Sequence, residues 1–158
     1  MKKIVILGRG GAGKSTLAKR LSSLNNIPYI ELDKHFWKPG LLPTPVNEWK
    51  ELQCKLTKDS SWIMDGDLGE YDALEIRLSA ADNVIVLDFP LLICLTRAIK
   101  RSPERFDFWW WLITWRLLSR PKLMRSIKSY APNANLKIFR DPDQLEKFLF
   151  SVEKLPKK

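Results

Sequence analysis

The sequence has 158 residues, of which 45% are hydrophobic and 28% are charged, a composition that fits one globular domain and excludes a disordered chain. It has no run of about 18 apolar residues that could span a bilayer, and its two cysteines have no second cysteine or histidine at metal-ligand spacing. We therefore expect residues 1–158 to form a single cytoplasmic domain with free thiols. The net charge of +9 is uneven, because nine lysines and arginines but only two acidic residues lie in 97–128. Such a basic region suits a polyanionic partner or forms a solvated helical face.

Short apolar runs alternate with amphipathic segments along the chain. Strands are expected at the β-branched runs, and helices where apolar residues recur at three- and four-residue spacing. In chain order we expect a strand at 3–7, a helix at 15–24, a strand at 27–32, an irregular Pro-rich stretch, a helix at 46–58, a strand at 62–64, a polar segment around 74–78, a strand at 83–87, helical regions at 90–101 and 106–128, a strand at 136–139 and a helix at 141–152. This alternation predicts an α/β fold whose parallel sheet is covered by helices on both faces.

The strongest motif is LGRGGAGKST, which lies between the first expected strand and the first expected helix. It contains the spacing G-x-x-x-x-G-K-S, in which backbone N–H groups and a helix N-terminus face phosphate groups. The lysine of such a loop reaches the β- and γ-phosphates, and the serine hydroxyl ligates Mg²⁺. The alternative is a Gly-rich turn that binds nothing. The motif predicts ATP and Mg²⁺ as ligands, held by Gly8, Gly10, Gly11, Ala12, Gly13, Lys14, Ser15 and Thr16.

Three expected strands end in an aspartate, where ligands gather in open parallel sheets. Asp65 and Asp88 follow apolar strands and could hold the metal together with Ser15, with Asp65 favoured. Asp33 precedes the irregular stretch and could accept a hydrogen bond from an acceptor substrate. The alternatives are structural, since Asp65 could belong to an Asp-Gly turn and Asp88 could cap the helix that follows Pro90.

Several further stretches resemble one family. LDKHFWKPG, WIMDGD, VIVLDFP, SPERFDFWW and SRPK are similar to the small P-loop kinases that are related to adenylate kinase and named DNA topology modulation proteins. The succession of strand, phosphate loop, helix, strand with Asp and a later Asp-Gly pair also resembles nucleoside-monophosphate and shikimate-type kinases. The resemblance implies a three-layer P-loop NTPase fold of the nucleoside-monophosphate-kinase type, with a five-stranded parallel sheet and the phosphate-loop strand in its middle.

The resemblance also implies roles for residues outside the loop. It makes Lys14 and Asp65 catalytic, and it makes 34–60 the acceptor-binding segment. The further contacts that we expect are Asp33, Trp37 and Asp67 for the acceptor, and Arg140 in the loop 140–142 for the adenine. Asp67 departs from the D-G-N-Y of relatives, and its carboxylate could alter the acceptor or disfavour a phosphorylated one by like-charge repulsion.

The lid is expected to be shortened. Relatives usually carry an arginine-rich lid where AIKRSPERFD here joins two helices directly. A lid excludes water and supplies arginines that spread the charge of the transferring phosphoryl group. Arg97 and Arg101 lie four residues apart on one helical face, and they could replace the lid arginines as catalytic residues or form a solvated basic face. Residues 97–128 would then be the basic, aromatic helices of the lid region.

The segment FDFWWWLITWRLL is apolar nearly all round a helix. It could pack between the core and the basic segment, form a homodimer surface, contact a membrane surface through its tryptophans, or stack on nucleic-acid bases.

The sequence thus predicts an ATP- and Mg²⁺-dependent phosphotransferase that acts on a nucleotide or another small acceptor. The alternative is an ATP-binding module with weak or no transfer, whose basic Trp-rich region binds nucleic acid or a protein partner.

Overall fold

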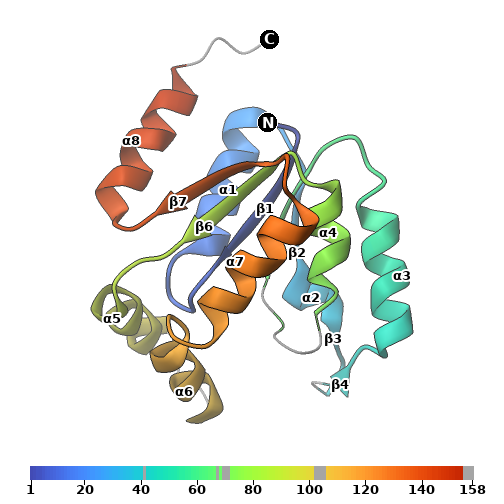
Figure 1. The fold of residues 1–158 in the computed structure, drawn as a ribbon, viewed down its shortest axis with the longest axis horizontal. Coiled ribbons are helices and arrows are strands. Elements are labelled where there is room, and N and C mark those ends of the chain that lie inside the picture. Colours follow the sequence, from blue (N-terminus) through green and yellow to red (C-terminus); the bar gives the residue numbers. More distant parts are fainter. Residues whose placement is uncertain (41, 67, 69–71, 102–105, 155–158) are drawn as a thin grey trace.

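The computed structural model describes residues 1–40, 42–66, 68, 72–101 and 106–154. Its centre is one parallel sheet of five strands in the order β2-β5-β1-β6-β7, with the strand that precedes the glycine-rich loop in the middle (Figure 1). The strands are β1 (Lys3–Gly8), β2 (Tyr29–Glu31), β5 (Trp62–Asp65), β6 (Asn83–Leu87) and β7 (Asn135–Phe139). The prediction of a five-stranded parallel sheet with this strand in the middle is confirmed.

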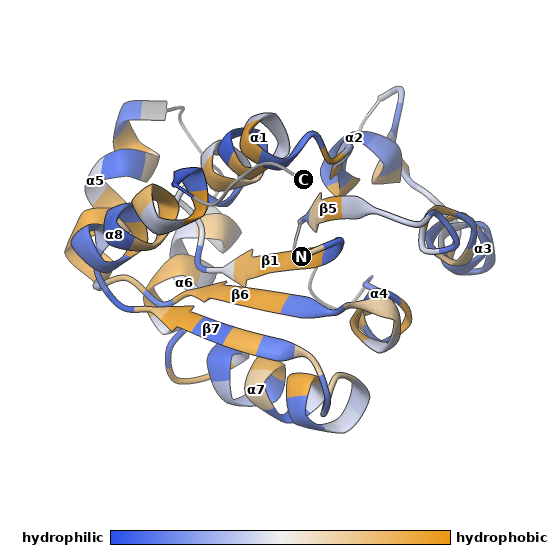
Figure 2. Ribbon diagram, turned by 90° about the horizontal axis from the view of Figure 1, so that it is seen from above, coloured by the Kyte–Doolittle hydropathy of each residue, from blue (hydrophilic) through white to orange (hydrophobic). Residues whose placement is uncertain are grey.

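Helices cover both faces of the sheet. They are α1 (Lys14–Asn25), α2 (Leu32–Phe36), α3 (Val46–Leu56), α4 (Leu74–Ala80), α5 (Leu91–Arg101), α6 (Phe106–Thr114), α7 (Ser119–Tyr130) and α8 (Pro142–Glu153). Apolar side chains of α1 and α8 pack on one face, and those of α3, α4 and α7 on the other. Helices α5 and α6 lie beyond the carboxyl ends of the central strands in both views (Figures 1 and 2). The arrangement has three layers, helices on either side of the sheet.

Strand β1 is buried on both sides, which explains its continuous apolar run. Ile4 and Ile6 join the cluster with α1 and α8, whereas Val5 and Leu7 join the cluster with α4 and α7. Successive side chains of a strand point to opposite faces, so a strand in the middle of a covered sheet needs apolar residues at every position. The hydrophobic colouring of β1 and β6 in Figure 2 follows from this position.

The structure corrects three expected elements. The Pro-rich stretch expected to be irregular contains α2 and a hairpin of β3 (Trp37–Lys38) and β4 (Leu42–Pro43), which Thr44 closes through two hydrogen bonds to the carbonyl of Phe36. The polar segment around 74–78 is helix α4. The region 106–128 is two helices separated by residues 115–118, and Pro121 lies in the first turn of α7, where a helix tolerates the missing N–H.

A buried ion pair attaches α4 to the end of β5. The guanidinium of Arg77 is fully buried and donates to both carboxylate oxygens of Asp72, at 2.5 and 2.7 Å. It also donates to the carbonyl of Gly66 at 2.8 Å and to the side chain of Gln53 at 3.2 Å. These bonds fix the backbone just after Asp65, which makes the pair part of what positions the site.

The Asp72→Ala substitution should destabilise the protein strongly. Removing one partner of a buried pair leaves an uncompensated charge, at a cost of about 3–5 kcal/mol in the free energy of unfolding. Urea denaturation followed by circular dichroism measures this cost. The control is Glu48→Ala, which removes an exposed pair with Lys38 and should cost less than about 1 kcal/mol. Equal costs for the two variants would contradict the structural role given to Arg77.

Candidate functional site

The glycine-rich loop connects β1 to α1 and presents the N-terminus of that helix. Gly13 is the N-cap of α1 with a positive φ of 92°, and among the described residues no side chain caps this end. The ammonium of Lys14 is folded back onto the loop, where it donates to the carbonyls of Gly8 at 2.9 Å and Arg9 at 3.2 Å. An uncapped helix N-terminus next to a lysine makes a locally positive concavity that suits phosphate groups.

Neighbouring elements touch the loop so closely that Gly10 and Gly11 have no room for a side chain. A Cβ at Gly10 would lie 2.8 Å from the ring of Phe108 and 2.9 Å from that of Trp111. A Cβ at Gly11, where φ is 72°, would overlap the backbone carbonyl of Cys94. Helices α5 and α6 are therefore in direct contact with the phosphate loop.

Asp65 lies beside the loop and holds two hydroxyl groups. Ser15 donates to Oδ2 of Asp65 at 2.7 Å, and Tyr29 donates to Oδ1 at 2.9 Å. Register places Asp65 opposite Ile6 of β1, two residues before Gly8. Burial, with a contribution from the charge of Asp65, raises the pKa of Tyr29 well above its usual range, so the phenol stays protonated and keeps donating. The sequence did not predict Tyr29 as a site residue. The only signal for it was its position in a strand that pairs with β5.

The oxygens of Ser15 and Asp65 fit a magnesium site. Mg²⁺ takes oxygen ligands and is usually bound by one or two carboxylates together with phosphates and water. Within the described parts of the chain no group of three or more His, Cys, Asp or Glu side chains could hold a metal alone. The pair is therefore suited to an ion that arrives with a phosphate ligand.

A cavity of about 230 Å³ opens next to the loop, on the α1 and α8 side of the sheet. Its lining includes Ala12, Gly13 and Thr16 from the loop region and Arg97 from α5. The guanidinium of Arg97 lies 5.8 Å from the ring centre of Phe89 and donates to the carbonyl of Ala12 at 3.4 Å. The rest of the lining is Leu17, Arg20, Phe89, Pro142, Leu145, Glu146 and Leu149. A flat heterocycle would find apolar contacts and a guanidinium here.

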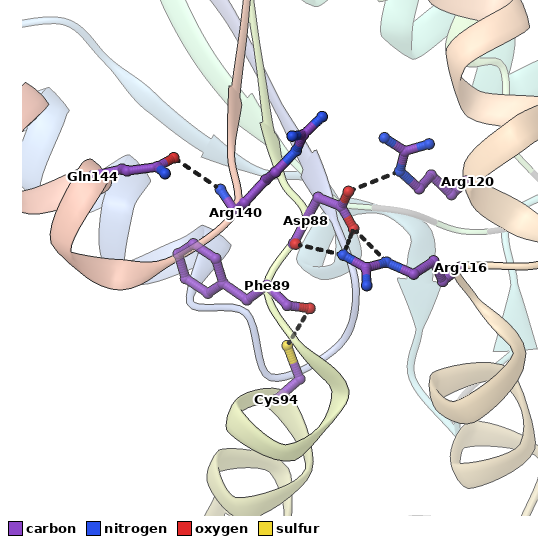
Figure 3. Close-up of polar contacts among 7 residues, drawn as sticks. All are labelled: Asp88, Phe89, Cys94, Arg116, Arg120, Arg140 and Gln144. Carbon is purple, nitrogen blue, oxygen red and sulfur yellow. Dashed lines mark hydrogen bonds and ion pairs between the residues drawn. The ribbon is translucent and has the colours of Figure 1, made fainter.

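Arg140 does not line this cavity. Its backbone N–H donates to the side chain of Gln144 at 3.3 Å, and Figure 3 shows its side chain pointing away from Gln144 toward the side on which Asp88 lies. Of the loop 140–142, Pro142 lines the cavity. An adenine contact from Arg140 therefore stays a prediction. Pro142, unlike Arg140, lines the cavity that could hold a nucleotide base.

Asp88 lies in surroundings that do not suit a metal ligand. Its carboxylate is buried, with Oδ2 accepting from Nε of Arg120 at 2.8 Å and Oδ1 accepting from Arg116 at 3.2 and 3.3 Å. Figure 3 shows the two guanidinium groups on one side of Asp88. Two cations on these oxygens would repel Mg²⁺, so the geometry favours Asp65 as the metal ligand.

The expected acceptor residues lie near the ends of β2 and β5. Asp33 is exposed in the first turn of α2, with its Oδ1 3.4 Å from where a Cβ on Gly66 would lie. Trp37 is 42% exposed and packs edge-on against Phe36. Asp67 and the side chain of Arg101 lie outside the described residues.

The aromatic helix α6 is packed on one side and exposed on the other. Leu112 and, just after the end of the helix, Trp115 are fully buried, whereas Trp110 is 60% exposed and Ile113 is 51% exposed. The packed side supports the prediction of a helix between the core and the basic segment. In the described parts of the chain no helix is long and apolar enough to cross a membrane, and both cysteines are free.

Sequence comparison finds a short match to a kinase. No family model matches the chain. A stretch of 33 residues is 54% identical to the shikimate kinase of Flavobacterium johnsoniae, and it covers 21% of this chain. The match spans only 19% of that enzyme's length.

Structure comparison finds likeness over nearly the whole chain. The shikimate kinase from Acinetobacter baumannii, solved in complex with shikimate, matches with a TM-score of 0.66 and 18% identity, covering 99% of this chain and 96% of that one. A gluconokinase from Sinorhizobium meliloti matches with a TM-score of 0.55 and 13% identity, over 96% of this chain and 91% of that one. The shikimate kinase from Aquifex aeolicus matches with a TM-score of 0.53 and 20% identity, over 95% of each chain. The chain has the fold of these small-molecule P-loop kinases.

The Asp65→Asn substitution should weaken the Mg²⁺ dependence of nucleotide binding. The amide keeps the size of the carboxylate but loses the charge that would attract the ion. We expect the affinity for Mg–ATP to fall toward the affinity for metal-free ATP, as measured by isothermal titration calorimetry with and without EDTA. If the ratio of the two affinities were the same in Asp65→Asn as in the wild type, Asp65 would not bind the metal, and Asp88 would become the candidate ligand.

Proposed function

We propose that the protein is an ATP- and Mg²⁺-dependent phosphotransferase that acts on a small-molecule acceptor. The observation that carries the proposal is the Ser15–Asp65 hydrogen bond beside an uncapped helix N-terminus. This bond brings together a hydroxyl and a carboxylate, oxygen groups that could hold a metal ion arriving with the phosphates of a nucleotide. The short match to a shikimate kinase and the shared fold with shikimate kinase and gluconokinase support the reaction class.

Two residues of the loop, Lys14 and Ser15, and the neighbouring Asp65 would have roles in this reaction. The ammonium of Lys14, now bonded to two loop carbonyls, would turn to the β- and γ-phosphates and neutralise charge as the phosphoryl group moves. Ser15 would contribute its hydroxyl to the metal, and Asp65 would bind it directly or through water. Mg²⁺ supplies charge neutralisation of the phosphates when it is bound. Positioning and electrostatics carry this chemistry, so no covalent intermediate on the protein is needed.

The nucleotide base would occupy the cavity on the α1 and α8 side of the sheet. Arg97 would cover the base, with its guanidinium held over Phe89. The acceptor would bind on the other side of the loop, between Asp65 and the segment 34–60, where Asp33 could accept a hydrogen bond from a hydroxyl group. Membership in the DNA topology modulation proteins and a role for nucleic acid or a homodimer stay predictions of the sequence.

The Lys14→Ala variant tests the proposal. We expect Mg²⁺-dependent ADP production from ATP to be stimulated by at least one member of a panel of nucleoside monophosphates and hydroxylated metabolites. Lys14→Ala should lower the stimulated rate by at least about a hundredfold, because it removes a charge that interacts with the transferring group. Lys19→Ala, on the exposed side of the same helix, is the matched control and should keep the wild-type rate.

Two outcomes would contradict the proposal. Wild-type activity in Lys14→Ala would show that the loop does not carry the reaction. Tight Mg–ATP binding without turnover on any acceptor would favour the alternative, a nucleotide-binding module.

A further inference from the structure

Both oxygens of the Asp65 carboxylate accept a hydrogen bond from an uncharged donor. Ser15 donates to Oδ2 at 2.7 Å and Tyr29 donates to Oδ1 at 2.9 Å, while the aspartate is only 3% exposed. Among the described residues no lysine or arginine forms an ion pair with this carboxylate, whereas Asp88 is paired with two arginines. A buried charge whose partners are hydroxyl groups is still uncompensated, so Asp65 attracts a cation.

The two donors differ in how easily they can leave the carboxylate. The hydroxyl of Ser15 sits on a short side chain in the first turn of α1, where rotation about one bond turns it away. The hydroxyl of Tyr29 sits at the end of a rigid ring on β2, and this ring packs against the apolar cluster on the α1 and α8 side of the sheet. The backbone of Tyr29 is paired in register with Ile63 of β5, the strand that ends in Asp65. When a metal arrives, Ser15 is therefore the donor that turns to it, and Tyr29 keeps its bond to Oδ1.

A carboxylate with one oxygen held in this way offers a metal ion only its other oxygen. The two common divalent cations that follow nucleotides differ in what they need from a carboxylate. Ca²⁺ takes about six to eight oxygen ligands and often binds both oxygens of one carboxylate, whereas Mg²⁺ is smaller, octahedral and keeps several waters. Binding through both oxygens of Asp65 would require the bond from Tyr29 to break. The phenol therefore penalises Ca²⁺ more than Mg²⁺.

We propose that Tyr29 is a positioning residue that leaves Asp65 one oxygen for the metal and thereby makes the nucleotide site select Mg²⁺ over Ca²⁺. The inference rests on the proposed function and adds the choice of ion to it. Tyr29 acts through Asp65 and needs no contact with the metal or the nucleotide. The hydroxyl group carries the effect and the ring only holds it in place, so the substitution Tyr29→Phe isolates the effect.

The test compares the affinity for a non-hydrolysable ATP analogue in saturating Mg²⁺ with that in saturating Ca²⁺, both measured by isothermal titration calorimetry. Comparing this ratio between variants cancels the different affinities of the two ions for the free nucleotide. We expect the ratio of the Mg²⁺ to the Ca²⁺ affinity to fall by about tenfold in Tyr29→Phe, which corresponds to one hydrogen bond to a charged group. The matched control is Tyr130→Phe, which removes a phenol hydroxyl from a residue that is 48% exposed on α7 and should keep the wild-type ratio.

A double-mutant cycle tests whether the effect passes through Asp65. In the Asp65→Asn background, adding Tyr29→Phe should change the ratio by less than about twofold. The reason is that an amide cannot bind Ca²⁺ through two oxygens, whether or not the phenol hydroxyl is present. A tenfold fall in this background as well would show that the hydroxyl acts elsewhere and would overturn the inference.

The results separate this inference from the proposed function. A wild type that binds the analogue with neither ion overturns the proposed function. A wild type that binds it, together with a Tyr29→Phe variant that keeps the wild-type ratio, overturns the role of Tyr29 alone. Equal losses of affinity with both ions count as this second result, because a merely structural hydroxyl would produce them.

A second measurement decides the question if Tyr29→Phe does not fold, as judged by circular dichroism. In a crystal structure of the wild type with Mg²⁺ and the analogue, Tyr29 should still donate to Oδ1 of Asp65. A metal ion bound by both oxygens of Asp65 would overturn the inference.

Discussion

The close packing of the phosphate loop is the constraint on which the rest of the site depends. The loop has neighbours on several sides, since Gly8 approaches the end of β6, Gly11 the carbonyl of Cys94 on α5, and Gly10 the aromatic rings of α6. A side chain at Gly10 would push α6 away, and one at Gly11 would push α5 away. The tryptophan-rich helix is therefore a support of the loop on its packed side, and its composition is explained in part by the need for flat apolar groups against a glycine backbone.

This packing also divides the carboxyl edge of the sheet by charge. Aspartates follow β2 and β5 on one side of the loop, with Asp65 holding the hydroxyls of Ser15 and Tyr29. Arginines gather on the other side around Asp88, at the ends of β6 and β7. The loop lies between the two halves. Charge alone would draw a metal ion to the first half and an anionic group to the second.

The features that could be predicted from the sequence are those that depend on residues close together in the chain. The loop motif and the buried strands were readable because spacing and apolar runs report on them directly, whereas strand-end position left both Asp65 and Asp88 open as partners of Ser15, with Asp65 favoured. Helix α4 was missed because its inward-facing Arg77 interrupts the apolar periodicity and is buried only through a non-local ion pair. The surroundings of Asp88 were missed for a similar reason, since Arg116 and Arg120 are 28 and 32 residues away in the chain. The spacing of residues along the sequence gives no sign that Arg116 and Arg120 both bind the carboxylate of Asp88.

The most direct test of the account is a crystal structure of the protein with Mg²⁺ and a non-hydrolysable ATP analogue. We expect the β- and γ-phosphates in the loop 8–15, Lys14 turned from the carbonyls of Gly8 and Arg9 to the phosphates, the metal on Ser15 and Asp65, and the base in the cavity beside Arg97. A nucleotide whose phosphates lie outside the loop, or whose base lies on the α7 side of the sheet, would contradict the account.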